Sequence, residues 1–291
     1  MIPAPFEYHA PKSLEEALRL LDRHGDEAKL LAGGHSLLPM MKLRLAAPRF
    51  VIDLGRLKGL DYIREEQGMI AIGAMTTHAE IENSSLLRAK CPLLSETAAA
   101  IGDVQVRNRG TLGGSLAHAD PAADYPASIL ALEAQMTMNS SMGVRAVDAA
   151  EFFLDMLTTQ LRPGEILTEI RVPALGKGTG AAYCKLSQPA SGYAVVGVAA
   201  RVTLAAGKLA QIAVGVTGVG PKAYRAVNVE DALRGKKASE KLLAEAARHA
   251  ARGVEALADL HASAGYRSEM AAVFTRRALE RAVARAAGTK A

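Results

Sequence analysis

The sequence feature that most constrains the fold is a pair of long apolar runs in the second half of the chain. They read "YAVVGVAARVTLAAG" at 193–207 and "KLAQIAVGVTGVG" at 208–220. Valine-rich runs are typical of strands, and Gly207 with Lys208 between them indicates a hairpin turn. Ala-rich helical segments follow from about residue 227, including one at 240–260. We therefore predict a C-terminal domain of antiparallel sheet and helices at 178–291.

The first 55 residues alternate between helical and strand patterns. Ser13 and Glu16 have the spacing of a capping box, and leucines at helical spacing follow as far as Gly25. Short apolar runs at 28–32 and 49–54 are typical of buried strands. This alternation predicts a small α/β part at 1–55.

Residues 56–177 have a different texture, with short strands and short helices. The expected strands are "LDYIRE" at 60–65, "MIAIGAM" at 69–75, "AQMTMNS" at 134–140, "VRAV" at 144–147 and "EILTEIRVP" at 165–173. Pro173 and the glycines of 176–180 mark a boundary with the segment that follows. The pattern predicts a middle α+β domain, and we assign the whole chain to the α+β class.

Composition argues against several classes of function. The chain has 291 residues with 49% hydrophobic content, enough for two or three domains. No apolar stretch reaches the roughly 18 to 20 residues of a membrane span and the start lacks a signal-peptide layout, so we expect a cytoplasmic protein. A net charge of +5 with 4% aromatic residues and no Trp disfavours a nucleic-acid-binding surface. Cys91 and Cys184 stand alone, so this chain offers no cysteine-ligated metal site.

Two glycine-rich stretches stand out against this background. The first is "LLAGGHSLLPMMKLRL" at 30–45, and the second is "RNRGTLGGSLAHADPAADYP" at 107–126. Glycine permits positive φ and close approach of a ligand to the main chain, so a glycine pair after a strand can direct several N–H groups at one anion. We expect positive φ at Gly34 and Gly114, and we expect Ser36 to cap a helix. The alternative is that the glycines only make tight turns.

Two such loops predict a long ligand that carries a pyrophosphate. A nucleoside triphosphate is disfavoured because the G-x-x-x-x-G-K-[ST] pattern is absent. A Rossmann fold is disfavoured because the loose glycine match at 176–181 lies in a loop and lacks an acidic residue about twenty positions on. His118, Asp120 and Asp124 do not share the period of one helix or strand, so hydrogen bonds to a polar ligand are favoured over a metal site.

At these stretches the sequence closely resembles the medium, FAD-binding subunit of bacterial molybdenum hydroxylases of the xanthine dehydrogenase family, especially the aerobic carbon monoxide dehydrogenase type. The resemblance rests on "AGGHSLLPMMKLRL" and "TLGGSLAHADPAADYP", and extends to "MIPAPFEYHAPKSLEEAL", "IGAMTTHAEI" and "YRSEMAAVFTRRALERA". It implies a flavin domain in two parts, of the vanillyl-alcohol-oxidase (PCMH) type. We expect non-covalent FAD binding, because neither His35 nor Cys91 lies in a segment that can be placed against the flavin ring. One departure is Ser115, which stands where Asn is common in the family.

The resemblance also implies which residues bind FAD, and it implies no metal ligand in this chain. The first loop comprises Leu31, Ala32, Gly33, Gly34, His35, Ser36, Leu37 and Leu38, the second comprises Thr111, Leu112, Gly113, Gly114 and Ser115, and the single positions are Ile101, Asp124, Leu167, Lys185 and Tyr193. Ile101 would lie beside the isoalloxazine ring, and Asp124 would hydrogen-bond the cofactor. Lys185 would stand near the N1 edge, where positive charge stabilises reduced flavin. Tyr193 would cover a flavin face.

The implied function is electron transfer within a larger complex. The flavin would receive electrons from two [2Fe-2S] clusters of a small partner subunit and pass them to an external acceptor, while a large subunit with a molybdenum cofactor carries the substrate chemistry. Carbon monoxide, an aldehyde, a purine or an N-heterocycle could be the substrate, with carbon monoxide favoured. The implied assembly is a dimer of heterotrimers. Two alternatives stay open: a free-standing flavin oxidase or reductase with its own substrate pocket, and a non-enzymatic nucleotide-binding module.

Overall fold

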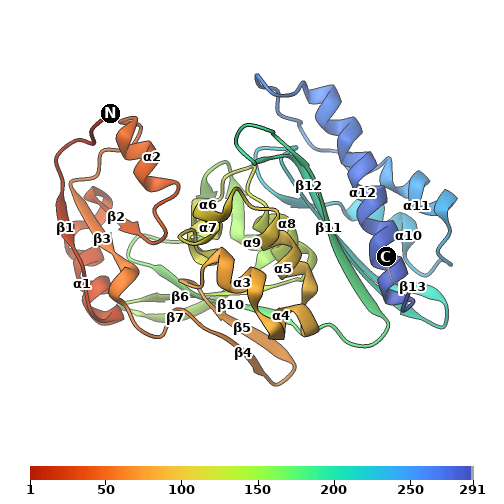
Figure 1. Ribbon diagram of the computed structural model, residues 1–291, viewed down its shortest axis with the longest axis horizontal. Helices are drawn as coiled ribbons and strands as arrows, with labels where there is room; N and C mark the ends of the chain where they lie inside the picture. The colour runs from red at the N-terminus through yellow and green to blue at the C-terminus, as the bar shows by residue number, and fades with distance from the viewer. Residues whose placement is uncertain (290–291) are drawn as a thin grey trace.

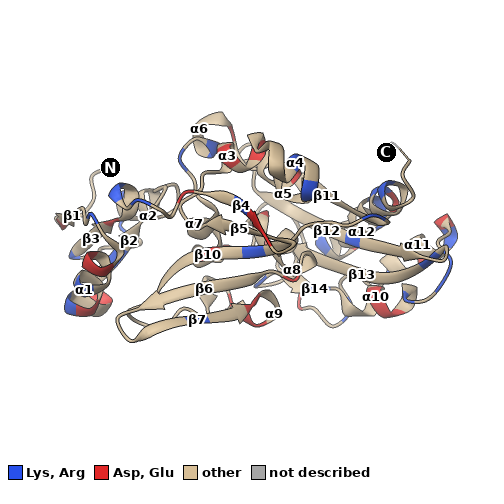
Figure 2. Cartoon of the chain, turned by 90° about the horizontal axis from the view of Figure 1, so that it is seen from below, with Lys and Arg blue, Asp and Glu red and all other residues tan. Residues whose placement is uncertain are grey.

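The computed structural model describes residues 1–289 of the chain. Three parts follow one another along its longest axis in Figure 1, and each is built around its own sheet. None of the helices among these residues is both long and apolar enough to cross a membrane. In the view of Figure 2, Lys, Arg, Asp and Glu are interspersed over the elements rather than gathered by sign.

The N-terminal part is a parallel three-stranded sheet. The strands β1 (Glu7–His9), β2 (Ala28–Leu31) and β3 (Phe50–Asp53) lie in the order β1-β3-β2, with α1 (Leu14–His24), α2 (Leu37–Lys42) and the single 3-10 turns Gly25–Glu27 and Leu54–Arg56 between and after them. Ser13 caps α1 by accepting from the Glu16 N–H, but the Glu16 carboxylate accepts from the Lys12 N–H, so only half of the predicted capping box forms. The pattern missed β1 because a three-residue strand with two exposed residues shows no apolar period.

The middle part is a five-stranded antiparallel sheet packed against a layer of helices. The strands are β4 (Ile63–Glu66), β5 (Met69–Gly73), β10 (Ile166–Pro173), β6 (Gln135–Ser140) and β7 (Gly143–Asp148), in that spatial order, and each strand predicted for this part is confirmed. The helices are α3 (His78–Asn83), α4 (Ser85–Lys90), α5 (Pro92–Ala99), α6 (Val104–Arg107), α7 (Leu112–His118), α8 (Tyr125–Ala131) and α9 (Ala149–Phe152), and a small hairpin joins β8 (Phe153–Asp155) to β9 (Thr158–Thr159).

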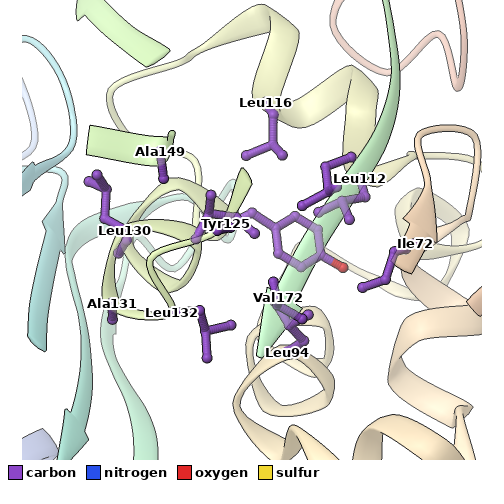
Figure 3. Packing of buried hydrophobic residues seen from close by; sticks show 14 of the residues in the cluster. Ile72, Leu94, Leu112, Leu116, Tyr125, Leu130, Ala131, Leu132, Ala149 and Val172 are labelled. Carbon is purple, nitrogen blue, oxygen red and sulfur yellow. The ribbon is translucent and has the colours of Figure 1, made fainter. Parts of the chain in front are cut away.

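Tyr125 occupies the centre of the core between this sheet and its helices. Its side chain is fully buried, and Figure 3 shows its ring among side chains from several elements, including Ile72 of β5 and Leu112 of α7. Full burial of an aromatic ring is a large apolar contribution, of roughly 2 to 3 kcal/mol. The helices that carry the second glycine loop are therefore fixed to the sheet by an apolar core.

The C-terminal part is a four-stranded antiparallel sheet followed by helices. The strands β11 (Thr179–Ser187), β12 (Ala194–Ala205), β13 (Lys208–Thr217) and β14 (Tyr224–Arg225) lie in chain order, and the helices are α10 (Val227–Leu233), α11 (Glu240–Ala247) and α12 (Ala264–Ala286). The predicted long hairpin is confirmed as β12–β13, but its turn lies at Ala206 and Gly207, both at positive φ, one residue before the predicted Gly207 and Lys208, because Lys208 already pairs with Ala205. The predicted helix at 240–260 is wrong beyond Ala247, where turns follow and Gly253 takes φ of +80°.

The two faces of the C-terminal sheet bind different neighbours. Val198 and Val214 belong to the core under α12, whereas Ala199 and Ala213 belong to the core of the middle part. This separation follows from the two-residue period of strands. Gly215 of β13 lets α8 of the middle part lie close to the C-terminal sheet, because a Cβ added at Gly215 would lie 2.0 Å from the carbonyl oxygen of Ala127 in α8. The C-terminal sheet is thereby packed directly against the helices that carry the second loop.

Candidate functional site

A cavity of about 680 Å³ lies where the three parts of the chain meet. Its walls come from the loop after β2, the segment that leads into α7, the loop before β10 and the turn before β12. The volume lies in the range of roughly 300 to 1,000 Å³ typical of cofactor sites. Both glycine-rich stretches contribute to this one cavity.

The first loop carries a run of backbone N–H groups into the cavity. The residues from Gly33 to Leu37 all line it, and among residues 1–289 the structure gives their N–H groups no hydrogen-bond acceptor. Gly34 has φ of +79°, as predicted. The predicted cap at Ser36 is wrong: its backbone is already helical (φ −107°, ψ −53°), and its side chain makes no capping bond. This loop therefore offers consecutive donors to one anionic ligand.

The second loop is held by the protein itself. Thr111 caps α7 by accepting from the Gly114 N–H at 3.1 Å, and the Gly113 N–H donates to the carbonyl of Ala74 at 2.8 Å. Gly114 lies inside α7 without positive φ, so that expectation is wrong. The second loop thus forms part of the cavity wall and contributes Ser115, which carries a hydroxyl group. The unpaired N–H donors come from the first loop.

The two loops touch through their main chains. A Cβ added at Gly33 would lie 2.2 Å from the carbonyl oxygen of Arg109 and 2.7 Å from the Cα of Gly110. A real Cβ does not approach that closely, so only glycine allows this contact. Gly33 is therefore required for loop–loop packing, and Gly34 for the turn itself.

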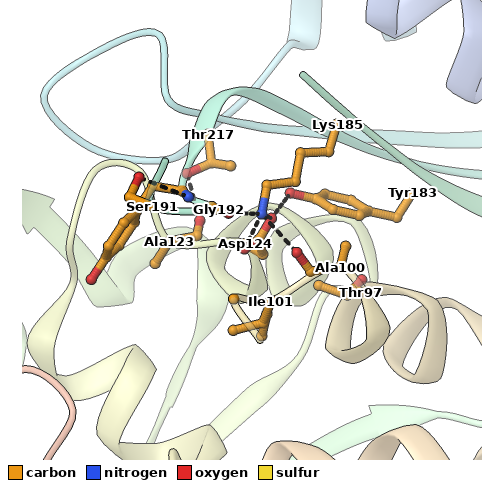
Figure 4. Close-up of polar contacts among 12 residues, drawn as sticks. Thr97, Ala100, Ile101, Ala123, Asp124, Tyr183, Lys185, Ser191, Gly192 and Thr217 are labelled. Carbon is orange, nitrogen blue, oxygen red and sulfur yellow. Dashed lines mark hydrogen bonds and ion pairs between the residues drawn. The ribbon is translucent and has the colours of Figure 1, made fainter. Parts of the chain in front are cut away.

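A buried polar cluster closes the side of the cavity next to the C-terminal sheet (Figure 4). The Lys185 ammonium lies 2.9 Å from the Asp124 carboxylate, and it donates to the carbonyls of Ala100 at 2.8 Å and Gly192 at 2.5 Å. The Tyr183 hydroxyl donates to Asp124 at 2.5 Å. The side chains of Lys185 and Asp124 are both 5% exposed. One ammonium therefore links β11, α8, the end of α5 and the turn before β12.

Burial dominates the ionisation of Asp124. It raises the pKa of this carboxyl to about 6, even though the Lys185 charge and the hydrogen bonds from Tyr183 and Lys185 act in the opposite direction. The Lys185 ammonium points into this cluster, and Lys185 is not among the residues that line the cavity. Its predicted place beside the flavin N1 edge stays a prediction.

Most of the residues expected to bind FAD face this one cavity. The lining includes Ala32, Gly33, Gly34, His35, Ser36, Leu37, Ile101, Thr111, Gly113, Gly114, Ser115, Asp124, Leu167 and Tyr193. Leu31, Leu38, Leu112 and Lys185 are not part of it, and Leu112 is fully buried in the core. Tyr193 is 44% exposed and lies beside Gly192 at the turn that covers the cavity.

The pattern also missed lining residues, of which His78 and Met75 are examples. They belong to "IGAMTTHAEI", a segment that the resemblance included without giving any of its residues a role.

His78 is a buried histidine with a lowered pKa. Its side chain is 5% exposed and packs edge-on against Tyr125, with ring centroids 5.2 Å apart. Burial, with smaller contributions from the nearby His35 and Arg107, lowers the pKa of His78 to about 4.

This lowered pKa predicts a pH dependence of stability. Between the ordinary His pKa of 6.5 and about 4, the unfolded chain binds a proton at His78 that the folded chain does not. Stability due to His78 is therefore complete above about pH 6.5 and is lost as the pH falls to about 4, by about 3 kcal/mol. We expect urea unfolding of the FAD-free chain to show this loss between about pH 7 and pH 4.5, and an H78Q variant to lack it. Equal losses in both proteins would contradict the assignment.

The residues present fit FAD. Unpaired N–H donors, glycines that hold two loops together and an apolar wall at Ile101 and Leu167 suit a long ligand with an anionic centre and an apolar ring. Within residues 1–289, the structure brings together no group of three or more His, Cys, Asp or Glu side chains suited to a metal ion. The N–H groups of the first loop are the donors that this chain offers to the pyrophosphate.

Comparisons with known proteins agree with this geometry. Residues 4–175 match the family described as FAD binding domain in molybdopterin dehydrogenase, and residues 181–282 match the CO dehydrogenase flavoprotein C-terminal domain. The carbon monoxide dehydrogenase medium chain of Hydrogenophaga pseudoflava is 44% identical over 287 residues, which cover 99% of this chain and 100% of that protein. The 6-hydroxypseudooxynicotine dehydrogenase complex subunit alpha of Paenarthrobacter nicotinovorans is 40% identical over 291 residues, covering 100% and 98%.

A solved structure extends the agreement to three dimensions. It is carbon monoxide dehydrogenase from Hydrogenophaga pseudoflava in a form that lacks the Mo-pyranopterin moiety of the molybdenum cofactor; one of its chains matches with a TM-score of 0.96 and 46% identity, covering 98% of this chain and 99% of that chain. The predicted fold class and the resemblance stated from the sequence are both confirmed. This chain therefore belongs to the family of FAD-binding subunits of molybdopterin dehydrogenases, and it carries the C-terminal domain of the CO dehydrogenase flavoproteins.

Proposed function

We propose that this chain binds FAD non-covalently and passes electrons through it, as the medium subunit of a molybdenum hydroxylase of the carbon monoxide dehydrogenase type. One observation carries the proposal: a cavity suited to FAD lies in a chain whose residues 1–289 bring together no group of three or more His, Cys, Asp or Glu side chains suited to a metal ion. Its only cysteines, Cys91 and Cys184, are buried in different cores. Electrons would therefore reach the flavin from clusters held by another chain.

The residues of this chain have three tasks in that function. Bound FAD supplies the ability to take up electron pairs and release them. The first loop would bind the pyrophosphate, and the contact between Gly33 and Arg109 would hold both loops at the spacing the cofactor needs. Ile101, Asp124 and Tyr193 would surround the flavin end, with Lys185 holding the segments that carry them.

The partners are part of the proposal. We propose a large subunit with the molybdenum cofactor, a small subunit with two [2Fe-2S] clusters, a dimer of such heterotrimers, and a cytoplasmic location with an external electron acceptor. Carbon monoxide is favoured as the substrate of the large subunit because the 44% identical relative is named for it. The relative at 40% identity is named for a different substrate, so the flavin subunit does not define the substrate by itself.

Purification of the native complex tests this function. We expect FAD, molybdenum and iron to copurify with this chain in a fixed ratio, carbon monoxide to bleach the flavin absorbance of the complex, and acid to release all the flavin into the supernatant. Flavin that stays in the acid precipitate would contradict non-covalent binding. A flavin-loaded single chain of 30.6 kDa that an organic substrate reduces without molybdenum or iron would instead support the free-standing oxidase or reductase.

A further inference from the structure

His78 lies directly against the start of the second loop. Its backbone N–H donates to the carbonyl of Gly110 at 2.9 Å, and the preceding Thr77 forms a β-bridge with Thr111. The imidazole ring also lies against this loop, because a Cβ added at Gly110 would lie 2.5 Å from His78 Nε2. His78 and Gly110 both line the cavity, so Nε2 is the ring nitrogen on the side of the loops.

The other ring nitrogen has no partner. His78 Nδ1 is buried without any hydrogen bond, and the side chain is 5% exposed. A proton on Nδ1 would bury an N–H group with no acceptor, which is costly. The neutral imidazole with its proton on Nε2 avoids that cost. The positive charge of Arg107 nearby, which Glu82 partly offsets through a contact of 2.7 Å, also opposes a second proton on the ring.

We propose that His78 binds FAD as a neutral imidazole, with Nε2–H donating a hydrogen bond to the diphosphate between the two loops. A phosphate oxygen is an acceptor only, so it needs a donor on the nitrogen it meets. The enclosed Nδ1 fixes the tautomer that provides this donor before the ligand arrives. Gly33 of the first loop and His78 Nε2 both lie against Gly110, so this neutral donor adds to the N–H groups that the first loop contributes.

Two amide variants test the position of the donor. The Gln side-chain amide can place an N–H where His Nε2 stands, whereas the Asn amide reaches only to the position of Nδ1. We expect H78Q to bind FAD within about threefold of wild type, and H78N to bind about 10- to 100-fold more weakly, the range for a lost hydrogen bond to a charged group. The measurement is a titration of flavin-stripped full-length chain, with any copurifying subunits retained. Equal affinities of H78Q and H78N would overturn the proposal.

Two further measurements separate a binding role from a structural one. ADP, which carries the diphosphate without the flavin, should lose affinity for H78N by about the same factor as FAD, as expected for a shared contact. Nitrogen-15 NMR of the imidazole at neutral pH should show a neutral ring with the proton on Nε2, with a larger shift of Nε2 than of Nδ1 when FAD binds. An imidazolium, an Nδ1–H tautomer, or unchanged ADP binding would overturn the proposal.

The proposal rests on FAD binding at this site: a wild-type chain that binds no FAD would refute the proposed function, whereas FAD bound equally by all variants would refute only the role of His78.

Discussion

A G33A variant is expected to bind FAD at least about a hundredfold more weakly than wild type, a loss of about 3 kcal/mol. The added methyl group would lie 2.2 Å from the carbonyl oxygen of Arg109; the backbone fixes the position of the methyl group, and the carbonyl is itself backbone, so neither can rotate away. The two loops must therefore separate, which changes the spacing of the N–H donors. A flavin titration and the FAD content of the purified protein measure the effect.

The matched control is G176A. Gly176 meets no atom within 4 Å at the Cβ position and does not have positive φ, so the same chemical change should leave FAD binding unaltered. Gly34 is a less specific test of the contact between the loops, because its φ of +79° would strain any side chain there and its Cβ would meet mainly the flexible side chain of Leu38, at 2.9 Å. A G33A protein with the flavin content of wild type would show that loop contact is not needed for FAD binding.

The second large effect is expected for K185M, which should lose about 3 to 5 kcal/mol of unfolding free energy. The substitution leaves the Asp124 carboxylate without its ammonium partner in a buried site, and it removes the donor to the carbonyls of Ala100 and Gly192. The turn that carries Tyr193 would lose its link to α5. We therefore also expect weaker FAD binding, measured by the same titration.

The pH dependence identifies the source of this loss. The pKa of Asp124 is raised above its ordinary value, to about 6, so the folded chain binds a proton more readily than the unfolded chain. The favourable contribution of that proton is complete below the ordinary pKa and is lost as the pH rises through about 6. Without Lys185 only the hydrogen bond from Tyr183 offsets the ionised carboxyl, so the deficit of K185M should be larger at about pH 8 than at about pH 5.

Two further variants serve as controls for K185M. Lys222 donates to a single carbonyl, that of Phe153, at 3.0 Å, so K222M removes a lysine–carbonyl bond without breaking an ion pair, and its effect should be much smaller. Adding D124N to K185M removes the buried Asp124 charge that K185M leaves without an ammonium partner, and should recover part of the unfolding free energy. A K185M protein as stable as K222M at both pH values would show that the ion pair contributes nothing.

Local sequence patterns determined most of the elements and the two glycine-rich loops that line the cavity. The strands at 28–31, 50–53 and 135–140 and the long β12–β13 hairpin follow from apolar periods and turn residues that lie within a few positions of one another. The positive φ of Gly34 follows in the same way from a glycine after a strand. The composition of both loops indicated a pyrophosphate ligand, and motifs along the whole chain indicated the family.

Only the tertiary structure decided how these pieces work together. Lys185 contacts Asp124 across 61 positions and Ala100 across 85, so no local pattern could show that its charge points inward. The role of Gly33 depends on Arg109, and that of His78 on an enclosed Nδ1 and the nearby Gly110. Local patterns also misplaced the helix end after Ala247 and the cap at Ser36, because final backbone angles depend on packing. Propensity and periodicity act between neighbours in sequence, whereas burial, ionisation and close backbone contact depend on neighbours in space.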